Sequence, residues 1–250
     1  AIEAACPQPG FLALLQERCP YAFAAHPVFV SAQQAARIRA LVDAIESVVA
    51  LPAYQAEVLA RAPAIARHQP GASGVFFGYD FHLADDGPRL IEINTNAGGA
   101  MLNALLARVQ RASCESAQER LPAAAADALE ARIVAMFHSE WAMSGRTRPL
   151  RSIAIVDEAP QGQYLLPEFL LFQRLFERHG IAAWICDPAE LDNVGGALTL
   201  RGQPVDLVYN RLTDFAFEAP ASGALREAWQ AGSAVITPHP RAHALYADKR

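Results

Sequence analysis

The hydrophobic positions in the first part of the chain recur at helical spacing. In the segment SAQQAARIRALVDAIESVVA, apolar residues fall three or four apart at Ile38, Leu41, Val42 and Ile45, behind Ser31, a residue type that caps helices. This pattern predicts a long amphipathic helix after Ser31, followed by a shorter one. The stretch HQPGASG, rich in proline and glycine, then ends the helical pattern.

Beyond that stretch the chain changes to strand-like patterns. The segment VFFGYDFHLADDGPRLIEINTN alternates between apolar and polar residues, which is typical of a β-hairpin, and two helices are expected to follow it. After the connector GRTRPLR, the strand SIAIVDE, the helix QYLLPEFLLFQRLFERHG and the strand IAAWICD form a βαβ unit. The segment ALTLRGQPVDLVYNRLT adds two strands around a turn at Arg201 and Gly202. These patterns predict an α/β fold with a mostly parallel sheet in the second half.

The hairpin pattern places two acidic side chains opposite each other. Side chains alternate between the two faces of a strand, so Asp80 and Phe81 lie on opposite faces. Consistent burial of the apolar residues requires Phe81 beside Ile91, and in that register Asp80 lies directly opposite Glu92. The loop left over is the three residues 85–87, with a glycine at the position that favours positive φ.

Two adjacent carboxylates repel each other, and a cation relieves that repulsion. Oxygen ligands from Asp80, Glu92 and the Asn94 amide suit a hard cation such as Mg²⁺. The alternative is that both acids form the solvated face of an amphipathic hairpin. The polar loop NTNAGGA favours the metal site, because its glycines let the backbone approach a ligand closely.

These residues resemble the magnesium-binding hairpin of the ATP-grasp superfamily of carboxylate-amine ligases. In that family an Asp on one strand and a Glu-x-Asn on the next hold the Mg²⁺ ions that bridge ATP phosphates, and IEINTN looks like that element. The spacing from Asp80 to Glu92 is similar to that of the glutathionylspermidine synthetase-like group. The resemblance implies Mg²⁺ and ATP as cofactors, small-molecule carboxylate and amine substrates, and ligation through an acyl phosphate.

Four further residues are candidates for catalysis or nucleotide binding. Arg211 ends the strand of VDLVYNRL and is expected to hold a substrate carboxylate in a bidentate pair, unless it pairs with a surface acid. Glu168 resembles a recurrent glutamate of the family, with a solvated helix face as the alternative. Asn96, in the loop after the hairpin, and Lys249, the only lysine, are candidates for cofactor binding.

The order of segments resembles the circularly permuted ATP-grasp group, in which the hairpin comes first and an ATP-clamping lobe comes last. We therefore expect N-terminal helices with the hairpin over residues 1–145, a pre-ATP-grasp-like α/β domain over residues 146–238, and the start of the clamping lobe over residues 239–250. The parent polypeptide is then expected to continue beyond this segment. Gly78 stands where the family commonly has an arginine, which keeps open a second function: a non-catalytic binding protein with the same fold.

Composition excludes several classes of protein. The 250 residues carry a formal charge of −5, which argues against a nucleic-acid partner. Apolar runs fall short of the roughly 18 residues that span a bilayer, so we expect no membrane partner and a cytoplasmic location. The four cysteines show no CxxC spacing, and GxSxG, P-loop and GxGxxG motifs are absent. His239 and His243 have the spacing of a two-histidine zinc site, but no third ligand accompanies them.

Overall fold

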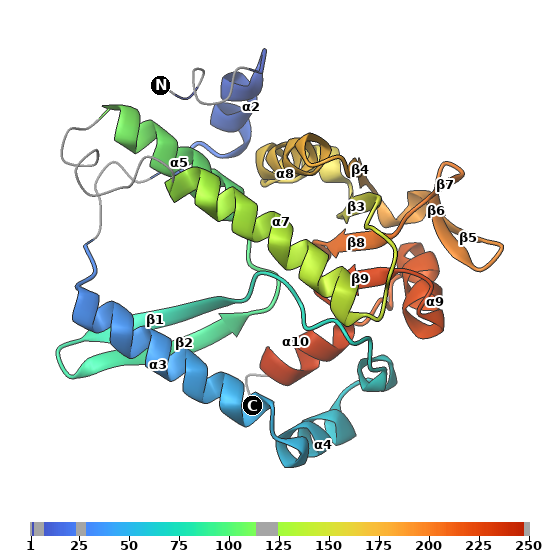
Figure 1. Cartoon of the computed structure of the whole chain (residues 1–250), viewed down its shortest axis with the longest axis horizontal. Helices are drawn as coiled ribbons and strands as arrows, with labels where there is room; N and C mark the ends of the chain where they lie inside the picture. Colours follow the sequence, from blue (N-terminus) through green and yellow to red (C-terminus); the bar gives the residue numbers. More distant parts are fainter. Residues whose placement is uncertain (1, 3–7, 24–28, 114–124, 248–250) are drawn as a thin grey trace.

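A computed structural model describes residues 2, 8–23, 29–113 and 125–247, and Figure 1 shows their arrangement. The α-helices are α2 (Phe11–Arg18), α3 (Ala32–Val49), α4 (Pro52–Arg61), α5 (Ala100–Ser113), α7 (Ala125–Met143), α8 (Leu166–Arg178), α9 (Gly223–Ala231) and α10 (Pro240–Tyr246), and a short 3-10 turn, η1 (Ala64–Arg67), follows α4. The strands are β1 (Gly78–Ala84), β2 (Gly87–Asn94), β3 (Ser152–Val156), β4 (Ala182–Cys186), β5 (Leu191–Val194), β6 (Ala197–Leu200), β7 (Gln203–Pro204), β8 (Leu207–Asn210) and β9 (Val235–Thr237).

The long helix predicted after Ser31 is confirmed. Ser31 Oγ accepts a hydrogen bond from the Gln34 amide at 3.1 Å, and the Gln34 side chain accepts one from the Ser31 amide, which together form a capping box. Pro52 then begins α4, a position where proline costs no hydrogen bond. Sequence-local chemistry therefore defines the start of both helices.

A four-stranded parallel sheet forms the centre of the second half, as predicted. Its strand order is β4-β3-β8-β9, with α8 connecting β3 to β4. The chain moves outward from β3 to β4 and then returns to the other side of β3 with β8. In such sheets, ligands bind beyond the carboxyl ends of the two strands between which the order reverses. Here those strands are β3 and β8.

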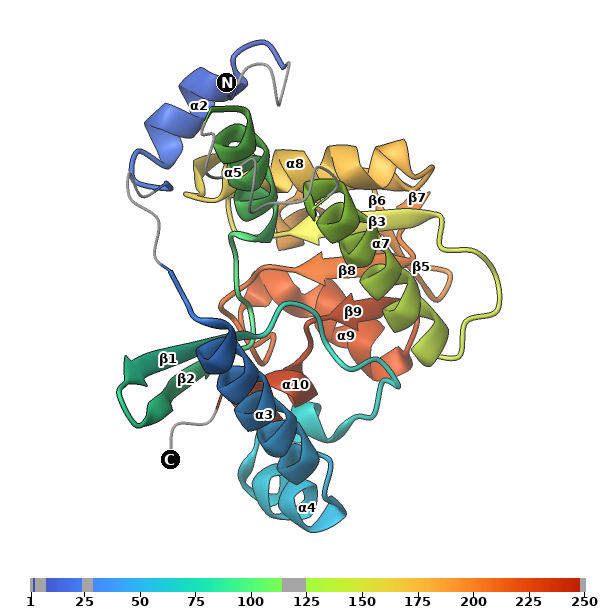
Figure 2. The ribbon, with the colours of Figure 1, turned by 60° about the vertical axis from the view of Figure 1, so that its left-hand side comes forward.

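Each face of this sheet packs against its own helices (Figures 1 and 2). Ile153 and Ile155 of β3 face a core shared with α2, α5, α7 and α8, whereas Ala154 and Val156 face a second core shared with α9. In the first core, Phe137 contacts Phe176 and Tyr209 edge to face, with ring centroids 4.9 and 5.2 Å away. Phe172 contacts Tyr209 in the same way. Strand β3 is therefore buried on both faces, as its continuous apolar sequence requires.

The segment 197–213, predicted to form two strands around a turn, contributes to two sheets. Of the strands in the segment 197–213, only β8 joins the parallel sheet, whereas β6 pairs antiparallel with β5 and β7 in a separate three-stranded sheet. The predicted turn at Arg201 and Gly202 is present, and both residues have positive φ, 49° and 78°. The turn chemistry was local and therefore predictable, and β6 pairs with the strands that directly precede and follow it in the sequence.

The hairpin register is confirmed at its base and corrected at its tip. Asp80 pairs with Glu92, as predicted, but Phe81 pairs with Leu90 and not with Ile91. Ile91 is the extra residue of a β-bulge and is 59% exposed. The loop is consequently the two residues 85–86, not three. Our prediction assumed an unbroken ladder, and alternation of residue types gives no sign of a bulge.

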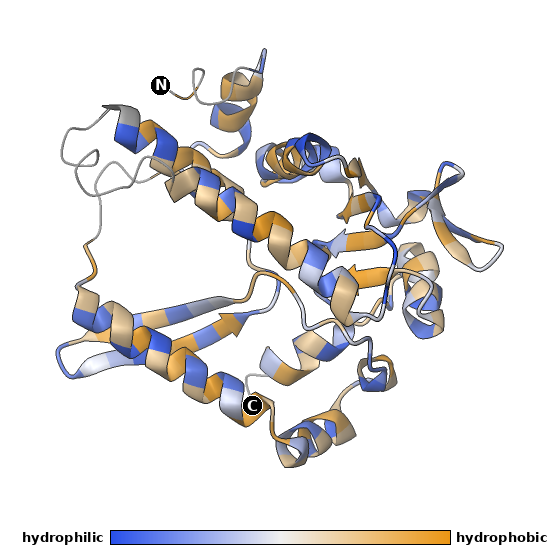
Figure 3. Cartoon of the chain, in the orientation of Figure 1, coloured by the Kyte–Doolittle hydropathy of each residue, from blue (hydrophilic) through white to orange (hydrophobic). Residues whose placement is uncertain are grey.

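The hairpin projects beside α3, away from the parallel sheet (Figure 2). The Tyr79 hydroxyl donates a hydrogen bond to Glu46 of α3, and the Tyr79 and Phe81 rings stack 6.5 Å apart. Figure 3 shows a hydrophilic hairpin tip, in contrast to the mainly hydrophobic strands of the parallel sheet. Over the described part of the chain, every helix is too short or too polar to cross a bilayer.

Candidate functional site

The residues predicted to bind metal lie together at the base of the hairpin. Asp80 is paired with Glu92, and the Asn94 side chain lies on the same face of β2 as Glu92. The Asn94 amide nitrogen is 3.2 Å from Asp80 Oδ2 and 3.1 Å from Glu92 Oε1, so it donates a hydrogen bond to each carboxylate. Asp80 and Asn94 are exposed and Glu92 is half-buried, so the cluster is open to solvent.

This donor set is compatible with a hard cation. If the Asn94 amide rotates by half a turn, its oxygen takes the place of the nitrogen that now bridges the carboxylates. Within the described ranges, no group of three or more His, Cys, Asp or Glu residues is arranged to hold a metal. The hairpin therefore offers two carboxylates and one amide, a partial set of the kind that Mg²⁺ accepts when substrate phosphates and water complete the shell.

Arg211 holds the loop that follows the hairpin. Its backbone amide donates to Val156 O at 2.8 Å, which places the side chain at the carboxyl ends of β3 and β8. Nη1 donates to Asn96 Oδ1 at 2.6 Å and to the carbonyl oxygens of Asn96 and Ala97 at 3.2 and 3.1 Å. The buried Nε has no hydrogen-bond partner among the described residues. Nη1 of the guanidinium thus binds the loop, and Nε is left without a partner among the described residues.

Glu168 holds the same loop from the other side. This carboxylate is completely buried, and its two oxygens accept the backbone amides of Gly99 at 2.7 Å and Met101 at 2.9 Å. Both amides lie at the start of α5, where the first N–H groups have no partner within the helix. The negative charge also interacts favourably with the positive end of the helix dipole. Glu168 of α8 is therefore the N-terminal cap of α5, a role that the sequence analysis did not consider.

The structure describes only one of the two candidates for cofactor binding, Asn96. Asn96 is fully engaged within the loop, because its oxygen accepts from Arg211 and its nitrogen donates to Leu212 O at 3.0 Å. Its predicted contact with a nucleotide stays a prediction. Lys249 lies outside the described residues.

Gly98 packs tightly between the loop and its two anchors, so we expect Gly98→Ala to destabilise the protein. A Cβ at this position would lie 2.4 Å from Leu165 Cδ1 and 3.0 Å from Arg211 Nη2. Overpacking of this kind costs about 1–3 kcal/mol of unfolding free energy, measurable by urea denaturation. Gly162→Ala is the matched control, since nothing lies within 4 Å of its Cβ position. Equal stability of the two variants would contradict the tight packing.

Asp157 is a candidate that the sequence analysis missed. It directly follows β3, beside Arg211 at the point where the strand order reverses. Burial raises the pKa of this carboxyl to about 6, and the positive charge of Arg211 opposes the shift only in part. An acidic residue directly after a fully apolar strand was the available signal, in SIAIVDE.

The two histidines at zinc-ligand spacing have other partners. His239 Nδ1 accepts the Ala242 amide at 3.0 Å as the N-cap of α10, and its Nε2 is 3.0 Å from the carbonyl oxygen of Ala72. His243 Nδ1 is 2.6 Å from Thr95 Oγ1. Both nitrogens of His239 are therefore occupied, which excludes it as a metal ligand in this conformation.

No protein-family model matches the chain, and no curated protein sequence matches it. A solved structure does share its fold. It is the apo form of a glutathione synthetase-like effector from Globodera pallida, with a TM-score of 0.55 and 16% sequence identity. The match covers 88% of this chain and 55% of the other, so the chain spans about half the length of that neighbour. At this identity the likeness concerns the fold alone, a mixed α/β fold.

Proposed function

We propose that the chain is part of an ATP-dependent carboxylate-amine ligase of the ATP-grasp type. The observation that carries the proposal is the cluster of Asp80, Glu92 and Asn94 at the base of a two-stranded hairpin. In this proposal these three side chains hold Mg²⁺, which neutralises the charge of the ATP phosphates. The fold neighbour supports an ATP-grasp-type fold. The ligase reaction, the permuted order of segments and the need for a further nucleotide-binding lobe stay predictions.

The loop anchors connect this cluster to a second site for the substrate. The Arg211 Nε and the Asp157 carboxyl lie together at the carboxyl ends of β3 and β8. A guanidinium is suited to hold a carboxylate through paired hydrogen bonds. Loop residues 95–99 run from the proposed metal ligands to Arg211 and Glu168, so the structure has a physical connection between the proposed nucleotide and carboxylate positions.

Removing one of the proposed ligands tests the function directly. We expect Glu92→Ala to weaken binding of Mn²⁺, used as a paramagnetic substitute for Mg²⁺, by about tenfold or more. Without metal, the variant should be as stable as the parent or more stable, because the mutation relieves repulsion between two carboxylates. Electron paramagnetic resonance measures the free Mn²⁺, and thermal unfolding measures the stability.

Asp85→Ala is the matched control, because Asp85 is an exposed carboxylate in the loop of the same hairpin. Its Mn²⁺ affinity should stay within about twofold of the parent. If both variants bind Mn²⁺ as the parent does, the cluster is not a metal site. If Glu92→Ala instead unfolds much earlier, Glu92 has a structural role.

A specific contact favours the second candidate function, a non-catalytic binding protein with the same fold. A Cβ at Gly78, where the ATP-grasp family commonly has an arginine, would lie 2.9 Å from Ala97 Cβ. The loop conformation therefore leaves no room for that arginine side chain. Calorimetric titration of the full-length protein with MgATP distinguishes the two functions: heat of binding supports the ligase, and its absence supports the binding protein.

A further inference from the structure

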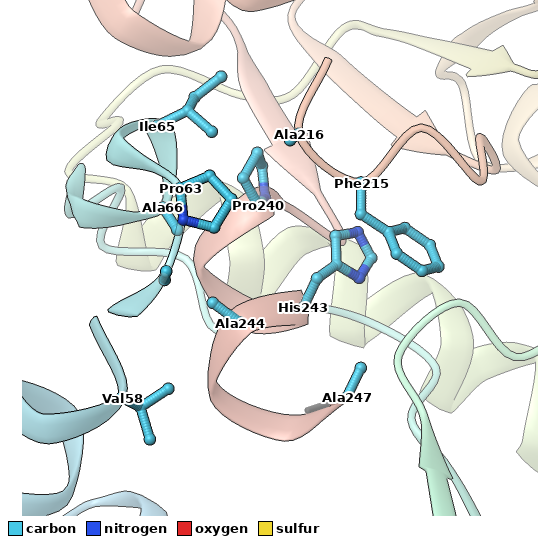
Figure 4. A pocket seen from close by; sticks show the side chains of 11 residues that line it. Val58, Pro63, Ile65, Ala66, Phe215, Ala216, Pro240, His243, Ala244 and Ala247 are labelled. Carbon is cyan, nitrogen blue, oxygen red and sulfur yellow. The ribbon is translucent and has the colours of Figure 1, made fainter. Parts of the chain in front are cut away.

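A cavity lies apart from the hairpin cluster, between α4, η1, α10 and the loop after β8 (Figure 4). Its volume is about 290 Å³, near the lower end of the range of about 300–1,000 Å³ for small-molecule sites. With one exception its described lining is apolar, made of Val58, Ala62, Pro63, Ile65, Ala66, Phe215, Ala216, Pro240, Ala244 and Ala247. The exception is His243, whose ring stacks on Phe215 with centroids 4.2 Å apart.

His243 is the one polar side chain in the described lining of the cavity. The side chain is 5% exposed, and its Nε2 is buried without a hydrogen-bond partner. Nδ1 is turned toward Thr95, so Nε2 lies on the other side of the ring. Most buried polar atoms in proteins have a partner, and an atom without one indicates that something is missing from the site.

The partner of Nδ1 determines which chemistry Nε2 offers. Thr95 is 2% exposed, and among the described residues its hydroxyl has a single partner, His243 Nδ1, at 2.6 Å. A buried hydroxyl that donates to Nδ1 satisfies its own proton, whereas a proton on Nδ1 would leave the hydroxyl hydrogen unpaired. We therefore assign the imidazole proton to Nε2. The otherwise apolar lining then includes one residue with an unpaired N–H donor.

We propose that this cavity binds a small, mainly apolar ring molecule that carries a single hydrogen-bond acceptor, and that the acceptor pairs with His243 Nε2. The size of the cavity suits one or two fused rings. The apolar lining favours rings without charge, and the unpaired donor selects molecules with an acceptor over hydrocarbons of the same shape. Neither the proposed metal ligands nor Arg211 lines this cavity, so the proposal is independent of the ligase function.

Quinoline and naphthalene form a matched pair of probes, because they differ only in one ring nitrogen, a hydrogen-bond acceptor. We expect quinoline to shift the methyl NMR signals of Ala244 and Ala247 and to bind about fivefold more tightly than naphthalene, the ratio that one net hydrogen bond gives. Absence of shifts at these methyl groups, or equal affinity for the two probes, would overturn the proposal.

Variants at positions 244 and 243 test separately how the volume of the cavity and its hydrogen-bond donor contribute to binding. Ala244→Leu narrows the cavity and should weaken binding of both probes, whereas Ala44→Leu, on an exposed part of α3, should leave binding unchanged. His243→Phe keeps an aromatic ring but removes the N–H, and should make the two affinities equal. If His243→Phe does not fold, two measurements still test the proposal: the affinities of the parent for the two probes, and probe binding by the Ala244→Leu variant. Unchanged quinoline binding in Ala244→Leu would refute the assignment.

Discussion

Replacing Glu168 with alanine is expected to lower the free energy of unfolding by about 3 to 5 kcal/mol. The mutation leaves the amides of Gly99 and Met101 without their acceptor, and both bonds, of 2.7 and 2.9 Å, go to a charged oxygen. It also opens a cavity where the Glu168 side chain is completely buried. Denaturation in urea, followed by circular dichroism, measures the change.

Two variants make this result specific. Glu168→Gln keeps one acceptor oxygen and should lose about half as much stability. Glu177→Ala removes an exposed carboxylate from the same helix and should change stability by no more than about 0.5 kcal/mol. Similar losses for Glu168→Ala and Glu177→Ala would show that the cap of α5 contributes nothing particular.

Features that depend on neighbouring residues were predictable from the sequence. The capping residue Ser31 and the start of α3 follow from local chemistry. The period of two placed Asp80 opposite Glu92 correctly, although the Phe81–Ile91 pair of the same register was wrong. The bulge at Ile91 was not predictable, because the same alternation fits a ladder with or without one extra residue.

The roles of Glu168 and Arg211 show where sequence reasoning stops. Both were selected as chemically interesting, and both are deeply buried in contact with the loop after the hairpin. Gly99 lies 69 residues from Glu168, and Ala97 lies 114 residues from Arg211. No periodicity extends over such separations, so only the tertiary fold reveals that these side chains bind backbone groups. The same reason explains why His239 resembled a zinc ligand and is an N-cap.

Acidification from pH 7 to pH 5 is expected to destabilise the protein through its two buried histidines. Burial lowers the pKa of His239 to about 4 and that of His243 to about 3. In the unfolded chain both titrate near about 6.5, so as the pH falls below that value the unfolded state takes up protons that the native state does not bind. The stability that comes from keeping these histidines neutral is therefore fully present above about pH 6.5. By pH 5 the two histidines together lower the free energy of unfolding by about 4 kcal/mol.

Asp157 acts in the opposite direction over the same interval. Its pKa is raised to about 6 in the native state, so on acidification the native state binds this proton before the unfolded state does. Acidification to pH 5 therefore raises the free energy of unfolding by about 1.4 kcal/mol through this group. The free energy of unfolding of the parent should then fall by about 2 to 3 kcal/mol between pH 7 and pH 5. Asp157→Asn removes the opposing contribution, so we expect the loss between pH 7 and pH 5 to steepen to about 4 kcal/mol in that variant.

Urea denaturation at pH 7, 6 and 5 measures how steeply the free energy of unfolding falls with pH in the parent and in Asp157→Asn. The interval ends at pH 5 because the carboxyls of Glu190, Asp206 and Asp214 have lowered pKa values and lose their stabilising charge only in stronger acid. A parent whose stability is the same at pH 7 and pH 5 would show that the histidines are protonated in the native state. An equal loss of stability between pH 7 and pH 5 in Asp157→Asn and in the parent would show that the Asp157 carboxyl ionises normally. A steeper slope in the variant is the result that follows from a buried acid beside Arg211 and two neutral histidines around α10.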